Sequence, residues 1–292
     1  MQVFKYGDYH PSLLPDGKLF KLIWNDEFDG PELDRTKWDF RLNFWGKRFQ
    51  TFTDEEALRF DGNSNLELHL IKKGDDYFAP LLQTGSLSYD IPKDTDGFWP
   101  FGEMRPPKFA HKYGYYECRC KLQKQPGWWS AFWLQAPGIG ATLNAERCGV
   151  EADILESFHP GTVIPHCMHW NGYGKNHRQM TTTGRPAFTS GEPDRDGNPT
   201  PDERVRLSLD EFHYFGMLWE KDGYTFYIDG KQNGIKLTRD LMPISDAEQF
   251  VLVHGECQGY RADNKPCDLV KEAILPDCFT VDFVRVFDVV DK

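Results

Sequence analysis

The sequence predicts an all-β protein, folded as an antiparallel β-sandwich. First, many short segments of the 292-residue chain alternate apolar and polar side chains, with the period of a half-buried strand. Second, Asp, Asn, Gly and Pro separate these segments at short intervals, as turns do. Third, almost no segment has helical periodicity. Many short strands without helices pack as two sheets around a common core.

The predicted strands follow one another from near the start of the chain to its end. Segments 66–70 and 115–122 alternate cleanly, so each predicts one buried and one exposed face. Segment 130–134 is nearly all apolar and predicts a short, largely buried strand. The other strands are expected at residues 22–24, 83–88, 149–158, 167–170, 212–219, 224–228, 250–254 and 279–287. No internal repeat or long linker interrupts this series, so a single domain over residues 1–292 is expected.

One of these strands, residues 149–158, carries three carboxylates in an otherwise apolar run. Glu151 and Asp153 stand two residues apart and therefore point to the same side of a strand. Glu156 has the opposite parity. A β-bulge of one extra residue across Ile154 and Leu155 would return Glu156 to the side of the other two acids, and bulges are frequent beside active sites.

The spacing of the two glutamates is typical of a glycosidase. With the bulge, the Cα atoms of Glu151 and Glu156 lie about 13 Å apart along the strand, and side chains that lean together bring the carboxyl groups to about 5–6 Å. A retaining glycosidase holds its nucleophile and its acid/base about 5–5.5 Å apart. On spacing alone, the alternative is a solvated acidic edge of the sheet without chemistry.

The charge balance and the aromatic content restrict the partners. The chain has 34 basic and 45 acidic residues, and 34 − 45 gives a net charge of −11. Phosphate-rich partners need Lys and Arg patches, so nucleic acids and anionic membranes are not expected. Aromatic residues make up 15% of the chain, with nine Trp. Flat aromatic rings cover the apolar C–H faces of sugars, so this high aromatic content favours a polysaccharide or oligosaccharide ligand. The alternative is that the rings fill the core.

The cysteines and the first residues bear on the cellular compartment. The seven cysteines are an odd number without a CxxC pair, which is typical of reduced thiols in a cytoplasmic protein. No charged segment followed by an apolar one opens the chain, and no apolar run approaches 18 residues, so neither a signal peptide nor a membrane span is predicted. We expect a cytoplasmic monomer, or a secreted protein if a leader has been trimmed from this chain.

Several segments, in order over about residues 22–288, carry a resemblance to a known family. They match its opening strand (24–30), its YGxxExR strand (113–119), its AxWL strand (131–134), its bulged signature E-x-D-x-x-E (151–156) and its closing strands (212–219, 226–230 and 281–286). The chain thus resembles glycoside hydrolase family 16, the group of laminarinases, lichenases, agarases and carrageenases.

The resemblance implies a concanavalin-like jelly roll with an open substrate cleft on its concave face. It further implies that Glu151 is the nucleophile, that Glu156 is the general acid and then the base, and that Asp153 hydrogen-bonds the nucleophile. Like charges this close also push their pKa values apart, which separates an acid from a base. No cofactor is required and no catalytic metal is expected. The family allows a structural calcium ion, for which Asp282 is a candidate ligand.

Residues close to the acidic strand are candidates for binding the sugar. Trp133 stands two positions from Ala131 in the AxWL strand and is expected to form the floor of the site; a core Trp is the alternative. Of Trp128 and Trp129, one is expected to line the cleft and the other to pack. The remaining candidates for substrate binding are Trp45, Trp99, His169, Trp170 and Glu256.

The predicted function is that of a retaining endo-glycosidase acting on a β-1,3-glucan or a mixed β-1,3/1,4-glucan. Residues 253–257 depart from the Asn-containing strand that many family members place beside the cleft. A β-galactan hydrolase of the agarase, porphyranase or carrageenase type therefore stays an alternative, as does a transglycosylase. Arg41, Lys47, Arg48 and Arg105 would suit a sulfated galactan. A non-catalytic carbohydrate-binding sandwich is the alternative from another class; it predicts the loss of a catalytic carboxylate, and all three are present.

Overall fold

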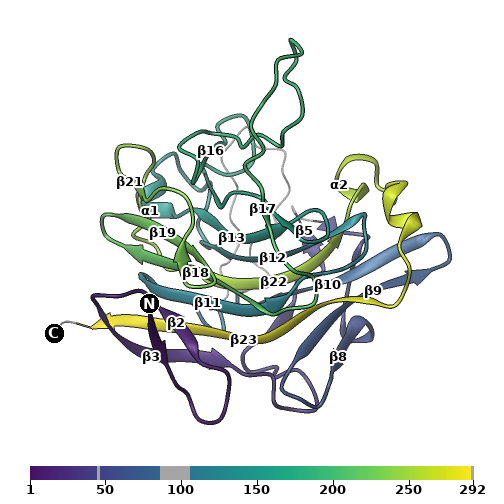
Figure 1. Cartoon of the computed structure of the whole chain (residues 1–292), viewed down its shortest axis with the longest axis horizontal. Coiled ribbons are helices and arrows are strands. Elements are labelled where there is room, and N and C mark those ends of the chain that lie inside the picture. The colour runs from purple at the N-terminus through teal and green to yellow at the C-terminus, as the bar shows by residue number, and fades with distance from the viewer. Residues whose placement is uncertain (45–46, 86–105, 291–292) are drawn as a thin grey trace.

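The computed structural model describes residues 1–44, 47–85 and 106–290, and most of them form two large sheets (Figure 1). We call the sheet with the acidic strand the β13 sheet. Its strands, from one edge to the other, are β4 (Asp39–Phe40), β10 (Asp76–Gln83), β22 (Phe250–Cys257), β12 (Trp128–Gln135), β13 (Glu151–Ser157), β15 (Cys167–Trp170) and β16 (Arg178–Thr181). All neighbours in this series are antiparallel, as predicted.

We call the other sheet the β23 sheet, after its long C-terminal strand. Its strands in order are β8 (Leu58–Phe60), β9 (Leu66–Lys73), β23 (Asp277–Val290), β11 (Gly114–Lys121), β18 (His213–Glu220) and β19 (Gly223–Ile228), and β20 (Lys231–Gln232) and β21 (Leu237–Thr238) both pair with β19. The first half of β23 pairs with β9, and its second half pairs with β3 (Leu19–Asp26). The length of β23 therefore allows two strands to share one of its edges.

Short elements complete the described chain. The remaining strands are β1 (Gln2–Phe4), β2 (Ser12–Leu14), β5 (Asn43–Phe44), β6 (Lys47–Arg48), β7 (Phe52–Thr53), β14 (Thr162–Val163) and β17 (Val205–Arg206). The helices are η1 (Glu55–Ala57), α1 (Ala145–Cys148), α2 (Tyr260–Asp263) and η3 (Leu269–Glu272). Among the described residues, no helix is long and apolar enough to cross a membrane.

The predicted strands are confirmed, with ends that differ by a few residues, except at 83–88. The strand there is β10, which ends at Gln83, while residues 86–88 lie outside the described part of the chain. The sequence did not predict β10 at residues 76–83 because it contains Pro80, and a residue without a backbone N–H argues against a strand inside a sheet. In the structure, Pro80 lies where β10 pairs in parallel with β7.

Side-chain alternation directs the apolar residues of both sheets into a shared core. In β9, Leu66, Leu68 and Leu70 are at most 2% exposed, whereas Glu67 and His69 between them are partly exposed. β9 and β10 pair with one another, and each also pairs within its own sheet, so the two sheets are continuous along this edge. The seven cysteines are free thiols, as the sequence predicts.

A charged cluster is buried where the β23 sheet meets the N-terminal hairpin β1–β2. Arg285 donates two hydrogen bonds to Glu27, at 2.8 and 2.7 Å, and a third to Ser12 Oγ at 2.9 Å. Glu117 accepts hydrogen bonds from Ser12 and from the backbone N–H of Leu13. Burial raises the pKa of Glu117 to about 8, although these hydrogen bonds oppose the rise. Glu117 is therefore protonated at neutral pH, and the cluster carries one cation, one anion and no net charge.

Candidate active site

The strand register places all three acids of β13 on one face. Asp153 lies opposite Trp133 of β12 and Glu156 lies opposite Ala131, whereas Ile154 has no partner because the register shifts at this point. The unpaired residue is the β-bulge that the sequence predicts. On the next strand, β15, His169 lies opposite Glu151 and therefore shares the face of the three acids.

This face of the β13 sheet forms the floor of a cavity of about 440 Å³. A volume in this range is typical of pockets that bind small ligands. The three acids line the cavity together with Trp129, Ala131, Trp133, Cys167, His169, Tyr173, His177, Gln179, His254 and Arg261. Aromatic rings and ionisable groups therefore share one hollow.

Glu151 is held by two hydrogen-bond donors. Tyr173 Oη and Gln135 Nε2 both donate to Glu151 Oε2, the latter at 3.1 Å. Arg41 fixes the orientation of the Gln135 amide, because its guanidinium can only donate and it donates to Gln135 Oε1 at 2.8 Å. Burial and the neighbouring Asp153 raise the pKa of Glu151 to about 7, against the hydrogen bond from Tyr173. Glu151 thus titrates near neutrality.

Asp153 and two histidines form a hydrogen-bonded row beside Glu151. His169 Nε2 lies 3.1 Å from Asp153 Oδ2, and His169 Nδ1 lies 2.9 Å from His177 Nε2, with the two imidazole rings stacked. Burial opposes protonation of His169, but its bond to Asp153 outweighs burial and raises the pKa to about 12. His169 is therefore a cation that pairs with Asp153 and donates to His177.

Glu156 has a different environment from Glu151. Burial, and then the charge of Asp153, raise the pKa of Glu156 well above its ordinary value. Among the described residues, none donates a hydrogen bond to the Glu156 carboxyl group. A buried carboxyl group without donors keeps its proton. The cluster titrates as a unit, and Glu156 is its most strongly protonated member.

Trp133 and Trp129 supply the aromatic part of the cavity. Trp133 is 4% exposed, and its indole N–H donates to His254 Nδ1 at 2.8 Å, so the proton of the neutral His254 ring resides on Nε2. Arg261 lies over the ring of Trp129, with 5.5 Å between the guanidinium carbon and the ring centre. Both indoles are held in place by neighbours rather than by the core alone.

Of Trp128 and Trp129, one lines the cavity and the other packs, as predicted, whereas the predictions for Trp170 and Glu256 are corrected. Trp128 alternates away from the cavity, is fully buried, and donates its indole N–H to Asp277 at 2.9 Å. Trp170 has the opposite parity to His169 on β15 and packs against the core. Glu256 is fully buried and binds Arg261 through two hydrogen bonds of 2.5 and 2.6 Å. Arg261 therefore occupies the carboxylate of Glu256, and Glu256 is not among the residues that line the cavity. Trp45 and Trp99 lie outside the described residues.

Several residues that surround the acids were not predicted from the sequence. Gln135 had a usable signal, because it stands two residues from Trp133 on the same strand and so shares its face. Tyr173 and His177 lie in the connection between β15 and β16, and Arg261 lies in α2. No local periodicity directs a loop side chain toward a site. These three could be placed only by the fold.

Two further groups of residues bear on metal binding. Asp282, the candidate calcium ligand, contacts two basic side chains, Arg119 Nη1 at 2.6 Å and His10 Nδ1 at 3.2 Å. An arginine beside the carboxylate does not fit a calcium site, which gathers oxygen ligands. Inside the cavity, Asp153, Cys167 and His169 hold potential ligand atoms within 4.8 Å of one another. In this structure the Nε2 atom of His169 pairs with Asp153 at 3.1 Å, so two of these three side chains already belong to the acid cluster.

Comparisons with known proteins give relatives of two kinds. Glucan endo-1,3-beta-glucosidase A1 of Niallia circulans is 25% identical over 223 residues, which is 72% of this chain but only 28% of that protein. Beta-porphyranase B of Zobellia galactanivorans is 26% identical over 215 residues, which is 73% of this chain and 67% of that protein. The chain therefore spans little more than a quarter of the first relative.

Solved structures show the same fold at low sequence identity. The catalytic domain of an endo-1,3-beta-glucanase (laminarinase) from Thermotoga petrophila superimposes with a TM-score of 0.62 at 22% identity and covers 94% of this chain and 100% of that one. An endo-beta-1,3-glucanase from Pyrococcus furiosus gives 0.60 at 23% identity, with 95% and 97% covered. The jelly-roll sandwich is thereby confirmed.

A family model decides the remaining question. The model described as the family 16 domain of beta-porphyranases A–D matches residues 23–289, which is nearly the whole chain and includes every strand of the β13 sheet. The resemblance seen in the sequence is therefore confirmed: this chain belongs to glycoside hydrolase family 16.

Proposed function

We propose that the chain is a retaining endo-glycosidase that hydrolyses a β-linked polysaccharide by double displacement. One observation carries this proposal: two carboxyl groups on one face of β13 have different environments. Glu151 accepts hydrogen bonds from Tyr173 and Gln135, which stabilise the carboxylate, whereas burial without donors keeps Glu156 protonated. At a pH between the pKa of Glu151 and the pKa of Glu156, the site holds one ionised nucleophile and one protonated acid, as the reaction requires.

In the first step, Glu151 attacks the anomeric carbon of the sugar. Both hydrogen-bond donors meet Glu151 Oε2, so we assign the attack to Oε1. As the new C–O bond forms, the glycosidic bond breaks and the departing oxygen takes the proton of Glu156. In the second step a water molecule attacks the same carbon, gives its proton to Glu156 and releases the Glu151 carboxylate. Two inversions retain the configuration.

Asp153 and His169 position the nucleophile rather than react. The ion pair between them keeps Asp153 negative next to Glu151, and that negative charge raises the pKa of Glu151. A more basic carboxylate is a better nucleophile toward the anomeric carbon. The hydrogen bond from His169 to His177 holds the imidazole ring of His169 in the orientation that its ion pair with Asp153 requires.

For the substrate, we propose a β-1,3-glucan or a mixed β-1,3/1,4-glucan. The net charge of −11 favours a neutral polymer, and Trp129 and Trp133 contribute apolar surface to the lining of the cavity. Several relatives and solved structures are named as 1,3-glucanases or laminarinases. A β-galactan is the second candidate. The observation in its favour is that the matching family model describes beta-porphyranases.

The mechanism is tested by exchanging the two glutamates separately. Glu151→Gln should lower turnover by roughly 10³-fold or more, because the amide cannot form the glycosyl ester. Glu151→Ala in sodium azide should release a glycosyl azide of inverted configuration, identified by proton NMR. Turnover by Glu151→Gln at the rate of the unmodified enzyme would contradict the assignment.

The substrate is tested by product profiles on laminarin, lichenan, agarose, porphyran and carrageenan. Release of a series of oligosaccharides from laminarin or lichenan supports the glucan proposal and endo cleavage together. Cleavage of a galactan with no action on either glucan would replace the first candidate by the second. The azide experiment is run on whichever polymer is cleaved, so the mechanism and the substrate are judged separately.

A further inference from the structure

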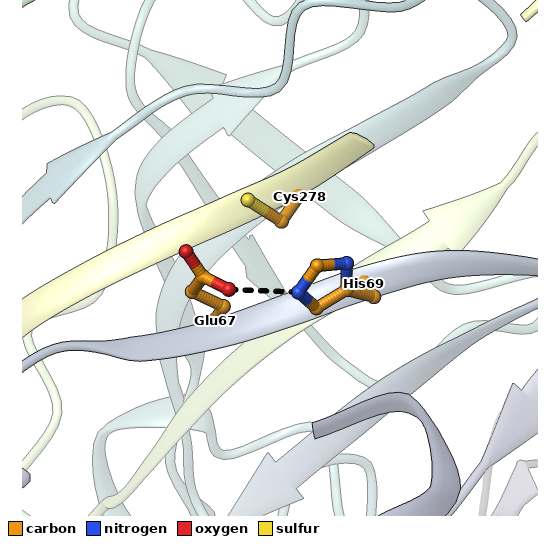
Figure 2. A group of neighbouring side chains, drawn as sticks. All are labelled: Glu67, His69 and Cys278. Carbon is orange, nitrogen blue, oxygen red and sulfur yellow. Dashed lines mark hydrogen bonds and ion pairs between the residues drawn. The ribbon is translucent and has the colours of Figure 1, made fainter. Parts of the chain in front are cut away.

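A second group of chemically active side chains lies on the β23 sheet, which carries none of the three acids of the active site. Glu67 and His69 project from β9, and Cys278 projects from the adjacent strand β23 (Figure 2). His69 is the cross-strand partner of Cys278, and Glu67 is the partner of Thr280. The alternation of β9 sends Leu66, Leu68 and Leu70 inward, so this group occupies the outer face of the sheet.

The three side chains converge on one point in space. Figure 2 shows the imidazole and the thiol turned toward the Glu67 carboxylate, and His69 Nε2 lies 2.8 Å from Glu67 Oε2. One potential ligand atom from each residue lies within 4.8 Å of the other two. The group thus offers one oxygen, one nitrogen and one sulfur to a single position.

This donor set is one that Zn²⁺ prefers. Zinc accepts Cys, His and Glu ligands together in a tetrahedral arrangement, with bonds of about 2.0–2.3 Å. Tetrahedral ligands on such bonds stand about 3.3–3.7 Å apart. The observed separations of 2.8 to at most 4.8 Å are within about 1 Å of these values.

The exposure of the group permits an ion to enter and still holds the ligands. The side chain of Glu67 is 28% exposed and that of His69 is 17% exposed, and Cys278 is half-buried. Thr280 Oγ1 contacts Cys278 Sγ at 3.5 Å and restrains its rotamer. Lys121, Asp277 and Glu67 are the charged groups that face the thiol. A zinc ion bound by one carboxylate and one thiolate is locally neutral.

We propose that Glu67, His69 and Cys278 form a zinc site that ties β9 to β23. The metal would take three protein ligands and one water molecule. On binding, the Cys278 S–H bond breaks, its proton leaves to solvent, and the sulfur donates to the metal; no electron is transferred. His69 coordinates as the neutral ring through Nε2, in place of its present hydrogen bond to Glu67. The site lies on the other sheet from Glu151 and needs no part in hydrolysis.

The proposal is tested on the whole chain after removal of bound metal with a chelator. Zn²⁺ titration should show one saturating equivalent by calorimetry, and Co²⁺ should give the thiolate-to-cobalt charge-transfer absorption together with the visible bands of tetrahedral cobalt. Zinc at a hundredfold excess over its dissociation constant should raise the midpoint of thermal unfolding by several degrees, because only the folded state presents the three ligands.

Matched variants distinguish this site from other thiols. Cys278→Ala should abolish the charge-transfer band and the thermal shift, and His69→Ala should weaken zinc binding at least tenfold. Cys167→Ala, which removes the thiol of the cavity group, should leave the charge-transfer band intact. Loss of the band in Cys167→Ala and its survival in Cys278→Ala would overturn the proposal.

A measurement on the unmodified chain covers the case in which a variant fails to fold. Zinc should slow alkylation of Cys278 by iodoacetamide, located by peptide mass spectrometry, and leave the labelling of Cys267 unchanged. Equal labelling of Cys278 with and without zinc would contradict the proposal. So would a titration without a saturating equivalent.

Discussion

Each of the two sheets buries a cluster of acids, and the charges of these acids are neutralised in different ways. In the β23 sheet, Arg285 neutralises Glu27 and Glu117 keeps its proton, so no charge is left over. In the β13 sheet, His169 neutralises Asp153, while Glu151 and Glu156 stand beside that pair with raised pKa values and face a cavity. A paired buried charge holds a fold together, whereas unpaired acids beside open space are arranged for chemistry.

This comparison predicts its largest effect at Glu156. Glu156→Ala should slow the cleavage of a polysaccharide by roughly 10³-fold or more, because an alkoxide leaving group then departs without a proton. An aryl glycoside with an activated leaving group should be attacked almost as fast as by the unmodified enzyme. Pre-steady-state release of the phenol measures this. Equal losses on both substrates would remove Glu156 from the role of acid.

The next effect concerns stability rather than activity. Arg285→Met should cost about 3–5 kcal/mol of unfolding free energy, because Glu27 loses its buried partner. Urea denaturation measures the loss. The double variant Arg285→Met with Glu27→Gln should recover part of it, since no anion is then left unpaired. If the single variant is as stable as the unmodified chain, the β23 cluster does not hold the fold.

A smaller effect is expected at Tyr173. Tyr173→Phe removes a hydrogen bond that favours the Glu151 carboxylate, so the pKa of Glu151 should rise above about 7 and the acidic limb of the kcat/KM profile should move to higher pH. At a fixed low pH, kcat/KM should fall about tenfold for each pH unit by which this limb moves. Tyr224→Phe, which removes a hydroxyl from the core instead, is the control. An unmoved acidic limb in Tyr173→Phe would separate Tyr173 from the nucleophile.

The last effect distinguishes the two clusters by the response of stability to pH. The pKa of Glu117 is raised in the folded state to about 8, so its contribution to stability is complete below the unfolded value near 4.5 and is lost as pH rises toward 8. Glu117→Gln should therefore reduce the decline of unfolding free energy over this window by roughly 1 kcal/mol per pH unit. Urea titrations at several pH values measure it. An unchanged slope would show that Glu117 is not the group that titrates.

The sequence was sufficient wherever strand parity decided the outcome. Parity put Glu151 and Asp153 on one face and required a bulge for Glu156, and the structure contains that bulge at Ile154. Parity was not applied to Trp128 and Trp129, because the predicted strand began at residue 130, whereas β12 begins at Trp128. The register with β22 and β13 distinguishes the two indoles, since it places Trp129 opposite Glu256 and in line with the acids.

Residues outside the strands needed the fold. Tyr173 and Arg261 are far from the acidic strand in sequence, and each reaches the cavity from an irregular segment or a short helix. Glu256 was among the residues expected to bind substrate. In the structure a cation from the following helix occupies its carboxylate. A contact between a strand and a short helix that follows it leaves no periodic pattern in the sequence.

The bulge at Ile154 relates the length of the segment from Glu151 to Glu156 to the distance between the nucleophile and the acid. If Ile154 were deleted, the segment would contain Glu, Asp and Glu at alternate positions, and regular pleating would by itself direct all three to the cavity. Two segment lengths therefore direct all three acids to the same face: five residues in a regular strand, or six residues with a β-bulge. What the sixth residue adds is reach, up to about 3.3 Å along the strand between the outer acids, together with a local bend. Insertion and deletion at this one position would thus tune the gap between nucleophile and acid in a way that no side-chain replacement can.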